Sequence, residues 1–401
     1  MWINRDLQQQ LAHDKSNYIQ ILIGPRQCGK SSLLSYLGQQ KFKEITLDDL
    51  QLRTLANEDP ALFLEQNPAP LIIDEAQYAP NIFPELKRII DEIKKKYMLS
   101  KNNIEISALF RLTGSNQILM DKKVKETLVG RATYYYLNTL SIHEIQRAFP
   151  EMAINNIMFI GGWPELYTNT NLSPIRYLND YIRNYIEKDI VLSAGIEKQK
   201  EFHTVLGLLA ARSGELLNCS SIANHSGVKS VTIKDWVSIL ERTKLVALLP
   251  PYENNLNKRL IKSSKIYFLD TGLLTRLQGW QEIEPFLKSP QIGHVFETLV
   301  FAEIIKFKEN YNKDWKISLW RTKEGDEIDF LIENARGECL ALDAKLGIHS
   351  IKPANLPHAF AKQFPQTKQL ILVSFGGKKQ QLSNTCLQLP ITELAHYLAD
   401  F

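Results

Sequence analysis

The sequence predicts an α/β chain in three parts: a parallel-sheet domain, a helical segment that leads into a winged helix, and a second α/β domain. A glycine-rich loop between an apolar strand and a helix predicts the first part. Two helical stretches followed by two strand-like runs predict the winged helix. The stretch "GDEIDFLIENARGECLALDAK" places two acid-bearing apolar runs around a tight turn, which predicts a hairpin in the last part. We place the domain, the helical segment, the winged helix and the last domain at residues 1–155, 156–215, 216–280 and 281–401.

The composition limits the class of protein. With 401 residues the chain exceeds what one hydrophobic core usually serves, and 44% hydrophobic with 23% charged residues is unlike a disordered chain. No apolar run reaches the roughly 18–20 residues that cross a bilayer, and the N-terminus lacks a secretory signal. We therefore expect a cytoplasmic protein with no membrane partner. The four cysteines are far apart and predict reduced thiols rather than disulfides or a zinc site: Cys28, Cys219, Cys339 and Cys386.

The first motif is a phosphate-binding loop. "YIQILIGPRQCGKSSLLSYL" spaces Gly24 four residues before Gly29-Lys30-Ser31, between an apolar strand and a helical run. Glycines let backbone N–H groups surround phosphate oxygens, and the helix N-terminus adds partial positive charge. Lys30 is expected to reach the β- and γ-phosphates and the Ser31 hydroxyl to bind Mg²⁺. The nucleotide-binding residues expected from this loop are Gly24, Pro25, Arg26, Gln27, Cys28, Gly29, Lys30, Ser31 and Ser32.

A second segment, "APLIIDEAQ", supplies two acids to the same site. Residues 71–73 predict a buried parallel strand, and Asp74 and Glu75 follow at its carboxyl end, where α/β folds bind ligands. We expect Asp74 to hold Mg²⁺ through water and Glu75 to polarise the attacking water. The alternative is an ordinary surface turn after a strand.

Two further polar residues are candidates for phosphate contacts. "ISALFRLTGSNQ" predicts a third strand that ends before Asn116, whose side chain can sense the γ-phosphate or the water. Arg131 precedes another strand-like run, and an arginine near phosphate stabilises transition-state charge. It would act in cis, or in trans across a homo-oligomer interface. A surface salt bridge is the structural alternative for Arg131.

These segments carry a family resemblance. "GPRQCGKSSLL", "LIIDEAQYAPNIFPELKRIID", "LTGSNQ", "LVGRATYYYLNTLSIHEI" and "GGWPELY" occur in this order, and the chain resembles prokaryotic AAA-type ATPases that carry an uncharacterised C-terminal region. The resemblance implies ATP binding and hydrolysis with Mg²⁺, and a winged helix joined to a nuclease-like domain. It also implies that the "GGWPEL" corner shapes a hinge or lid. Cys28 and Ser31 stand where Val and Thr are common, which the chemistry tolerates.

The middle of the chain combines an aromatic helix face with a basic winged helix. Tyr177, Tyr181 and Tyr185 recur every four residues, which favours core packing. Helices near residues 220–224 and 230–242 precede two strand-like runs that read as a wing. Residues 229–265 contain eight Lys or Arg and three acids, a charge of +5 that leaves −1 for the remainder of the +4 chain. Such charge favours DNA phosphates, although winged helices also bind proteins or serve as spacers.

The C-terminal hairpin predicts a metal site. A four-residue turn sets Asp329 and Asp343 nearly opposite each other, and two carboxylates that close favour a cation such as Mg²⁺ between them. Lys345 points to the same face and can orient or deprotonate a water. With Glu297 on the preceding helix, this is the pattern of the PD-(D/E)xK nucleases; Glu327 is a substitute ligand. A decayed nuclease fold kept for binding is the alternative.

Two functions remain from the sequence. The first is an ATP-driven enzyme acting on DNA, branched or single-stranded, with Mg²⁺-dependent cleavage at the C-terminal site. The second is an ATP-dependent switch whose C-terminal half binds DNA or a protein partner without cutting. A transcription factor with an ATP-sensing domain is a lesser alternative, because no segment suggests a dimeric half-site reader.

Overall fold

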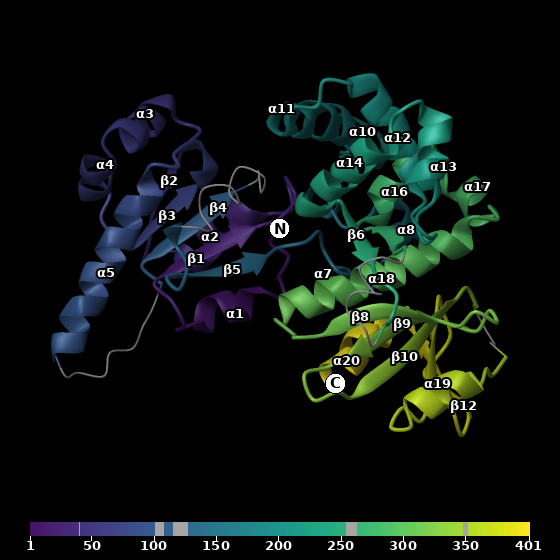
Figure 1. Ribbon diagram of the computed structural model, residues 1–401. Helices are drawn as coiled ribbons and strands as arrows, with labels where there is room; N and C mark the ends of the chain where they lie inside the picture. The colour runs from purple at the N-terminus through teal and green to yellow at the C-terminus, as the bar shows by residue number, and fades with distance from the viewer. Residues whose placement is uncertain (40, 101–107, 115–126, 254–262, 348–351) are drawn as a thin grey trace. The chain divides into compact units, whose positions relative to one another are not determined.

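The computed structural model in Figure 1 describes residues 1–401 except 40, 101–107, 115–126, 254–262 and 348–351. The chain divides into two compact units. The N-terminal unit contains Asn4–Asn138 and Asp189–Gly195, and the C-terminal unit contains Met1–Ile3, Thr139–Lys188 and Ile196–Phe401. The first division therefore falls at Asn138, before the boundary expected at residue 155, while the finer boundaries at 215 and 280 stay predictions.

The N-terminal unit is built on a five-stranded parallel sheet of order β2-β3-β4-β1-β5. In register, Ile23 of β1 lies beside Gly114 of β4 and Tyr136 of β5, so the carboxyl ends of these strands share one edge. Ligands of parallel sheets bind outside this edge. The strands are β1 (Ile19–Ile23), β2 (Lys43–Thr46), β3 (Leu71–Asp74), β4 (Phe110–Gly114) and β5 (Ala132–Tyr136).

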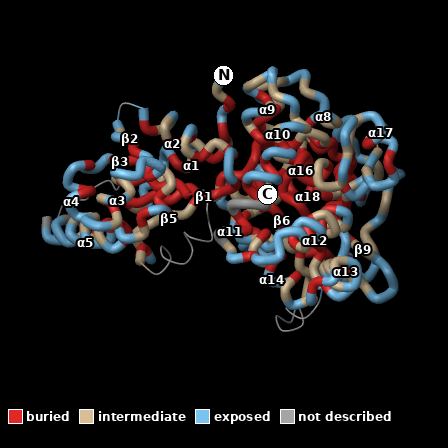
Figure 2. The backbone as a smooth tube through the Cα atoms, turned by 90° about the horizontal axis from the view of Figure 1, so that it is seen from above, coloured by how far each residue is buried: buried red, intermediate tan, exposed pale blue. Residues whose placement is uncertain are grey.

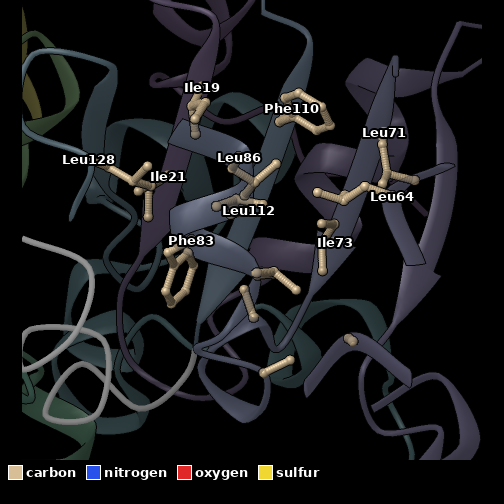
Figure 3. Close-up of a cluster of buried hydrophobic side chains, with 14 of the residues drawn as sticks. Ile19, Ile21, Leu64, Leu71, Ile73, Phe83, Leu86, Phe110, Leu112 and Leu128 are labelled. Atoms are coloured by element: carbon tan, nitrogen blue, oxygen red, sulfur yellow. The ribbon is translucent and has the colours of Figure 1, made fainter. Parts of the chain in front are cut away.

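Apolar side chains on one face of this sheet form the core shown in Figure 3. Alternation along each strand sends Ile19 and Ile21 to the same side, where Phe83 and Leu86 of α5 cover them. α2 lies along β3 and β4, with Gly38 close to the side chain of Ile72. The helical elements of this unit are α1 (Gln8–His13), α2 (Lys30–Gly38), α3 (Leu50–Glu58), α4 (Pro60–Gln66), η1 (Ala76–Tyr78) and α5 (Ile82–Ser100).

The first part of the C-terminal unit is helical. Two of the three tyrosines predicted to pack in the core do so: Tyr181 and Tyr185 are buried, with ring centroids 5.1 Å apart, whereas Tyr177 is partly exposed. The ring of Trp163 in the "GGWPEL" corner lies 4.7 Å from that of Tyr181. The elements are α7 (Ile142–Ala148), α8 (Ile154–Ile160), α9 (Glu165–Thr168), α10 (Pro174–Tyr181), the π-helix η2 (Ile182–Ile190) and α12 (Gln199–Ala211). η2 crosses the boundary between the units, and α11 (Val191–Ala194) lies in the N-terminal unit.

A helix-turn-helix and an antiparallel strand pair follow in the predicted order. α13 (Cys219–Ser226) ends at Gly227 and α14 (Ser230–Arg242) begins three residues later. β6 (Val246–Leu249) pairs antiparallel with β7 (Lys265–Phe268). The tip of the predicted wing falls within residues 254–262, outside the described residues.

A long buried helix organises the rest of the C-terminal unit. α18 (Ile292–Asn310) contacts β7, β10 and α16, and its apolar residues lie all round the helix, as expected for a buried one. Figure 2 shows buried residues along α16 and α18, and in β1 of the other unit. The neighbouring elements are α16 (Thr271–Leu277), α17 (Ile283–Leu287), η3 (Ile391–Glu393) and α20 (Leu394–Ala399).

The C-terminal sheet has six strands in the order β12-β13-β11-β10-β9-β8. The predicted hairpin is present: β9 and β10 are antiparallel and joined by the turn at residues 334–338. β11 then runs parallel to β10, and Phe360 of α19 packs on Leu331 and Ala341. The elements are β8 (Lys316–Arg321), β9 (Glu327–Glu333), β10 (Cys339–Lys345), α19 (His358–Gln363), β11 (Leu370–Ser374), β12 (Gln380–Ser383) and β13 (Cys386–Pro390).

Buried charges anchor the first residues of the C-terminal unit. Asp270, fully buried at the start of α16, accepts hydrogen bonds from Thr139 Oγ1 at 3.0 Å and the Gly162 amide at 2.8 Å. Lys306 donates to the Leu140 carbonyl at 2.9 Å. A buried polar group is costly unless it is paired, so these contacts fix the segment that follows the N-terminal unit.

The four cysteines are free, as predicted, with Cys339 the partly exposed one. Across the described stretches, no helix combines the length and the apolar character needed to cross a membrane.

Candidate functional site

The phosphate loop, residues 24–31, joins β1 directly to α2. Gly24 has φ 156°, and a Cβ there would lie 2.0 Å from the Leu137 carbonyl oxygen, so glycine is required. Gly29 begins α2 with φ 95°, a left-handed conformation that favours glycine. Arg26 and Gln27 in the loop and Ser32 after it have exposed side chains, whereas those of Pro25, Cys28 and Lys30 are buried.

The Lys30 ammonium lies across the loop. Its Nζ donates to the Gly24 carbonyl at 3.1 Å and the Pro25 carbonyl at 2.8 Å. These hydrogen bonds keep the Lys30 ammonium at the concave side of the loop. Phosphate oxygens bound there would compete with the two carbonyls for the ammonium. The geometry agrees with the phosphate role predicted for Lys30, which stays a prediction.

Asp74 accepts hydrogen bonds from two hydroxyl groups, one of which belongs to the phosphate loop. The Ser31 hydroxyl donates to Asp74 Oδ1 at 2.8 Å, and the Thr113 hydroxyl at the end of β4 donates to the same oxygen. Hydroxyl and carboxylate oxygens are the ligands that Mg²⁺ prefers. The donor set therefore fits a magnesium ion held with nucleotide phosphates, through Ser31 and Asp74.

Glu75 takes an unusual backbone conformation next to Asp74. Its φ of 55° is left-handed, which costs a non-glycine residue on the order of 1–3 kcal/mol and is concentrated at functional sites. Its amide donates to Thr113 Oγ1 at 3.2 Å, and its carboxylate accepts from the Gln77 side chain. The turn thus ties the Glu75 main chain to the end of β4 and its carboxylate to Gln77.

Arg131 is not brought to the phosphate loop of its own chain. It precedes β5, whose first residue Ala132 pairs with Ile19, so it lies at the amino edge of the sheet while the loop follows the opposite end of β1. There its guanidinium binds the Asp91 carboxylate of α5 at 2.7 and 2.9 Å. Parallel strands carry their first residues away from the ligand edge, and the role of Arg131 in cis or in trans stays a prediction. The predicted sensor Asn116 lies outside the described residues.

A residue far from the motif braces the loop. Arg5 donates to the Cys28 carbonyl at 2.8 Å and to the Asn138 carbonyl at 2.7 Å, and the Cys28 thiol lies 3.2 Å from the Leu137 carbonyl. Sequence reasoning missed Arg5 and Thr113. Thr113 had a signal, since it ends a parallel strand beside Asp74; Arg5 had none, because its partners are main-chain oxygens.

The C-terminal carboxylates form a second polar site, the acid cluster, which comprises Glu297, Glu327, Asp329 and Asp343. Extending the register of β9 and β10 by one pair sets Asp329 opposite Asp343, as predicted. The two side chains bond to the opposite strands: Asp343 Oδ1 accepts from the Asp329 amide at 3.1 Å, and Asp329 Oδ2 from the Ala344 amide at 2.9 Å. Lys345 Nζ lies 3.7 Å from Asp343 Oδ2.

The pKa values of Asp329 and Asp343 are both raised in the folded chain. Burial raises the pKa of Asp329 to about 7, and the negative charges of Asp343 and Glu297 act in the same direction. Burial also raises the pKa of Asp343, against the opposing charge of Lys345. Two like charges in a low-dielectric setting disfavour double ionisation, so the pair behaves as one coupled acid.

Glu297 is engaged by two residues of β7. Lys265 Nζ lies 3.0 Å from Glu297 Oε1 and 2.7 Å from Glu327 Oε1, and Tyr267 donates to the same Glu297 oxygen at 2.5 Å. Burial opposes the charged form of Lys265, but Glu297 and Glu327 outweigh it and hold the lysine pKa above its ordinary value.

The predicted metal-ligand set is therefore not assembled. In the ranges that the structure describes, no three carboxylate, histidine or cysteine side chains converge as metal ligands. The set Glu297, Asp329 and Asp343 needs this correction because an ammonium and a phenol already satisfy Glu297. Lys265 and Tyr267 were missed, although the alternation of "KIYF" places both on one face of a strand.

Ion pairing also reduces the basic surface that the sequence predicted. Of the eight basic residues counted in residues 229–265, Lys265 lies in the acid cluster and Lys244 binds Glu309 at 2.5 Å. Lys229, Lys234 and Arg242 of the helix-turn-helix are exposed. The other three, Lys258, Arg259 and Lys262, fall outside the described residues.

Comparison with known proteins separates the chain into three stretches. Residues 16–146 match an AAA domain family, and residues 152–284 and 292–394 match two families described as domains of unknown function. With the loop and sheet described above, the first match identifies an AAA-type P-loop ATPase domain. The boundary between the two other matches falls just before α18, so Lys265 and Glu297 lie in stretches that match different family models.

Two relatives of low sequence identity match most of the chain. An uncharacterized protein of Mycobacterium tuberculosis is 26% identical over 78% of this chain and 67% of its own length. An uncharacterized protein of Methanocaldococcus jannaschii is 24% identical over 85% of this chain and 78% of its own length. Among solved structures, a Walker-type ATPase of Pyrococcus abyssi superposes with a TM-score of 0.42 and 14% identity, covering 69% of this chain and 96% of that one.

Proposed function

We propose that the chain hydrolyses ATP at the phosphate loop and uses its nucleotide state to control DNA binding by the C-terminal unit. One observation carries the first half: Asp74 gathers the hydroxyls of Ser31 and Thr113 below a loop that holds the Lys30 ammonium. These side chains come from the ends of three different strands, and their convergence is stronger evidence than the sequence motif alone.

Each side chain has a role in this reaction. When nucleotide binds, the Lys30 ammonium leaves the loop carbonyls and binds the β- and γ-phosphates. Glu75, in its strained turn, orients the attacking water. Magnesium, held through Ser31 and Asp74, supplies charge neutralisation on the phosphates when bound. Arg131, placed on the far edge of its own sheet, serves only in trans, which implies a homo-oligomer. Asn116 remains the expected γ-phosphate sensor.

The helix-turn-helix supports the DNA half of the proposal. Lys229 and Lys234 are exposed at the start of α14, where the helix N-terminus adds partial positive charge, and Arg242 is exposed at its other end. Followed by β6 and β7, these helices have the order of a winged helix, whose second helix lies in the major groove in DNA-binding members. Contact through lysines predicts binding that weakens with salt.

Fluorescence anisotropy with duplex, single-stranded and branched DNA tests this half. The double variant Lys229→Glu/Lys234→Glu is expected to bind about tenfold more weakly, and its salt dependence to fall by about two released ions. Lys198→Glu/Lys200→Glu makes the same charge change on exposed lysines at the start of α12 and serves as the matched control. If the wild type binds none of the three DNA forms, the C-terminal unit serves a protein partner instead.

Phosphodiester cleavage is the second candidate function. The opposition of Asp329 and Asp343, with Lys345 two residues on, favours it. The donor set is incomplete, however, since only Asp329 and Asp343 remain for a metal once Lys265 takes Glu297. Cleavage that requires Mg²⁺ or Mn²⁺ and disappears in Asp343→Ala and Lys345→Ala would support this function. A wild type that cuts no DNA form leaves the ATP-dependent switch.

A further inference from the structure

Lys265 supplies a positive charge to the acid cluster. Its ammonium bridges Glu297 at 3.0 Å and Glu327 at 2.7 Å, and its side chain is 10% exposed. Tyr267, two residues on and fully buried, holds the same Glu297 oxygen. The lysine is thus fixed by two carboxylates and by a neighbour that orients one of them.

The lysine comes from a different region than the acids it binds. Lys265 and Tyr267 belong to β7, within the stretch 152–284, whereas Glu297 and Glu327 belong to α18 and β9, within the stretch 292–394. All four residues lie in one compact unit. The acid cluster is therefore composite, and the pattern of acids within the hairpin describes only half of it.

A bound ammonium and a divalent cation exclude each other here. Both would draw on the Glu297 carboxylate, whose Oε1 already accepts from the Lys265 ammonium and the Tyr267 hydroxyl. Two cations within a few ångströms in a partly desolvated site also repel strongly. Lys265 cannot turn away cheaply, because its largely buried ammonium would lose both of its carboxylate partners.

We propose that Lys265 is the built-in counter-ion of the acid cluster and keeps divalent metal ions out of it. Lys265, on the strand that precedes α16, then blocks metal binding at the acid cluster. This inference concerns the second candidate function, but it does not require that the site ever cuts DNA.

Mn²⁺ binding to nucleotide-free, full-length protein, followed by electron paramagnetic resonance, tests the proposal. Lys265→Met is expected to bind Mn²⁺ about tenfold or more tightly than the wild type, because the competing charge is gone and two carboxylates are freed. Adding Asp343→Asn to Lys265→Met should abolish the gain, which assigns it to the acid cluster rather than to the phosphate loop. Lys244→Met removes another paired lysine of the same unit, bound to Glu309, and should leave Mn²⁺ binding unchanged.

Circular dichroism, and thermal unfolding with and without Mn²⁺, check that the variants are folded. Lys265→Met should unfold at lower temperature without metal and recover part of the loss with it, and Lys265→Gln, which keeps a donor for Glu297, serves if the methionine variant does not fold. A folded Lys265 variant without added affinity overturns the proposal. So does wild-type Mn²⁺ binding that Asp343→Asn removes. Cleavage assays are read separately, so absent cleavage refutes only the nuclease candidate.

Discussion

Asp74 and Glu297 are both carboxylates in polar sites, but they are satisfied by different kinds of donor. Asp74 accepts from two neutral hydroxyls, those of Ser31 and Thr113. Glu297 accepts from the Lys265 ammonium and the Tyr267 phenol. Hydroxyl donors orient a carboxylate and leave its charge available to a cation, whereas an ammonium cancels that charge. The type of hydrogen-bond partner therefore distinguishes a site prepared for a metal from one that is closed.

The largest expected effect tests the prepared site. Lys30→Ala should reduce ATP hydrolysis by on the order of a hundredfold, about 3 kcal/mol, because the γ-phosphate loses its fixed positive charge. Steady-state phosphate release measures it. Lys41→Ala, an exposed lysine of the same unit, is the control. Unchanged hydrolysis in Lys30→Ala would remove the phosphate loop from the proposed reaction.

A smaller effect tests the charge crowding of the acid cluster. Asp329 has a pKa of about 7 in the folded chain, above its ordinary value, so between about pH 4 and 7 the folded state retains a proton that the unfolded state has lost. The free energy of unfolding therefore falls as pH rises through this window, by about 2 kcal/mol between pH 5 and 8.

Asp329→Asn should flatten this decline, since the amide cannot ionise and still accepts from the Ala344 amide. Thermal unfolding of both proteins at pH 5 and pH 8 measures the difference, with Glu324→Gln as an exposed-acid control. An equal decline in the variant and the wild type would show that the carboxylates do not repel each other as described.

The smallest expected effect concerns Thr113. Thr113→Val keeps the shape of the strand end but removes one donor to Asp74, so ATP hydrolysis should fall by about fivefold, on the order of 1 kcal/mol. Thr113→Ser keeps the hydroxyl and should restore most of the rate. If the valine and serine variants lose the same amount, packing at the strand end matters rather than the hydroxyl.

The sequence predicted the phosphate loop and the end of β3 because those parts are local. Gly24 to Ser31 follow one another between a strand and a helix, and Asp74 ends another buried strand of the same parallel sheet. The opposition of Asp329 and Asp343 was also predictable, because a short turn fixes the register of a hairpin.

Other features depend on partners that no local pattern reveals. Arg131 looked close to the phosphates because it precedes a strand, yet the first residue of a parallel strand lies at the edge away from the ligand. Lys265 was counted as surface charge, because its acid partners lie 32 and 62 residues further along the chain. Charge counting cannot distinguish a solvated lysine from one that is buried in an ion pair.

Arg5 has a mechanical consequence. It ties the main chain of Cys28 in the phosphate loop to that of Asn138, the last residue of the N-terminal unit. The next residue, Thr139, is already anchored to Asp270 in the other unit. One peptide bond, which sets the two Cα atoms about 3.8 Å apart, therefore separates the residue that Arg5 fixes to the phosphate loop from the residue that Asp270 fixes in the next unit.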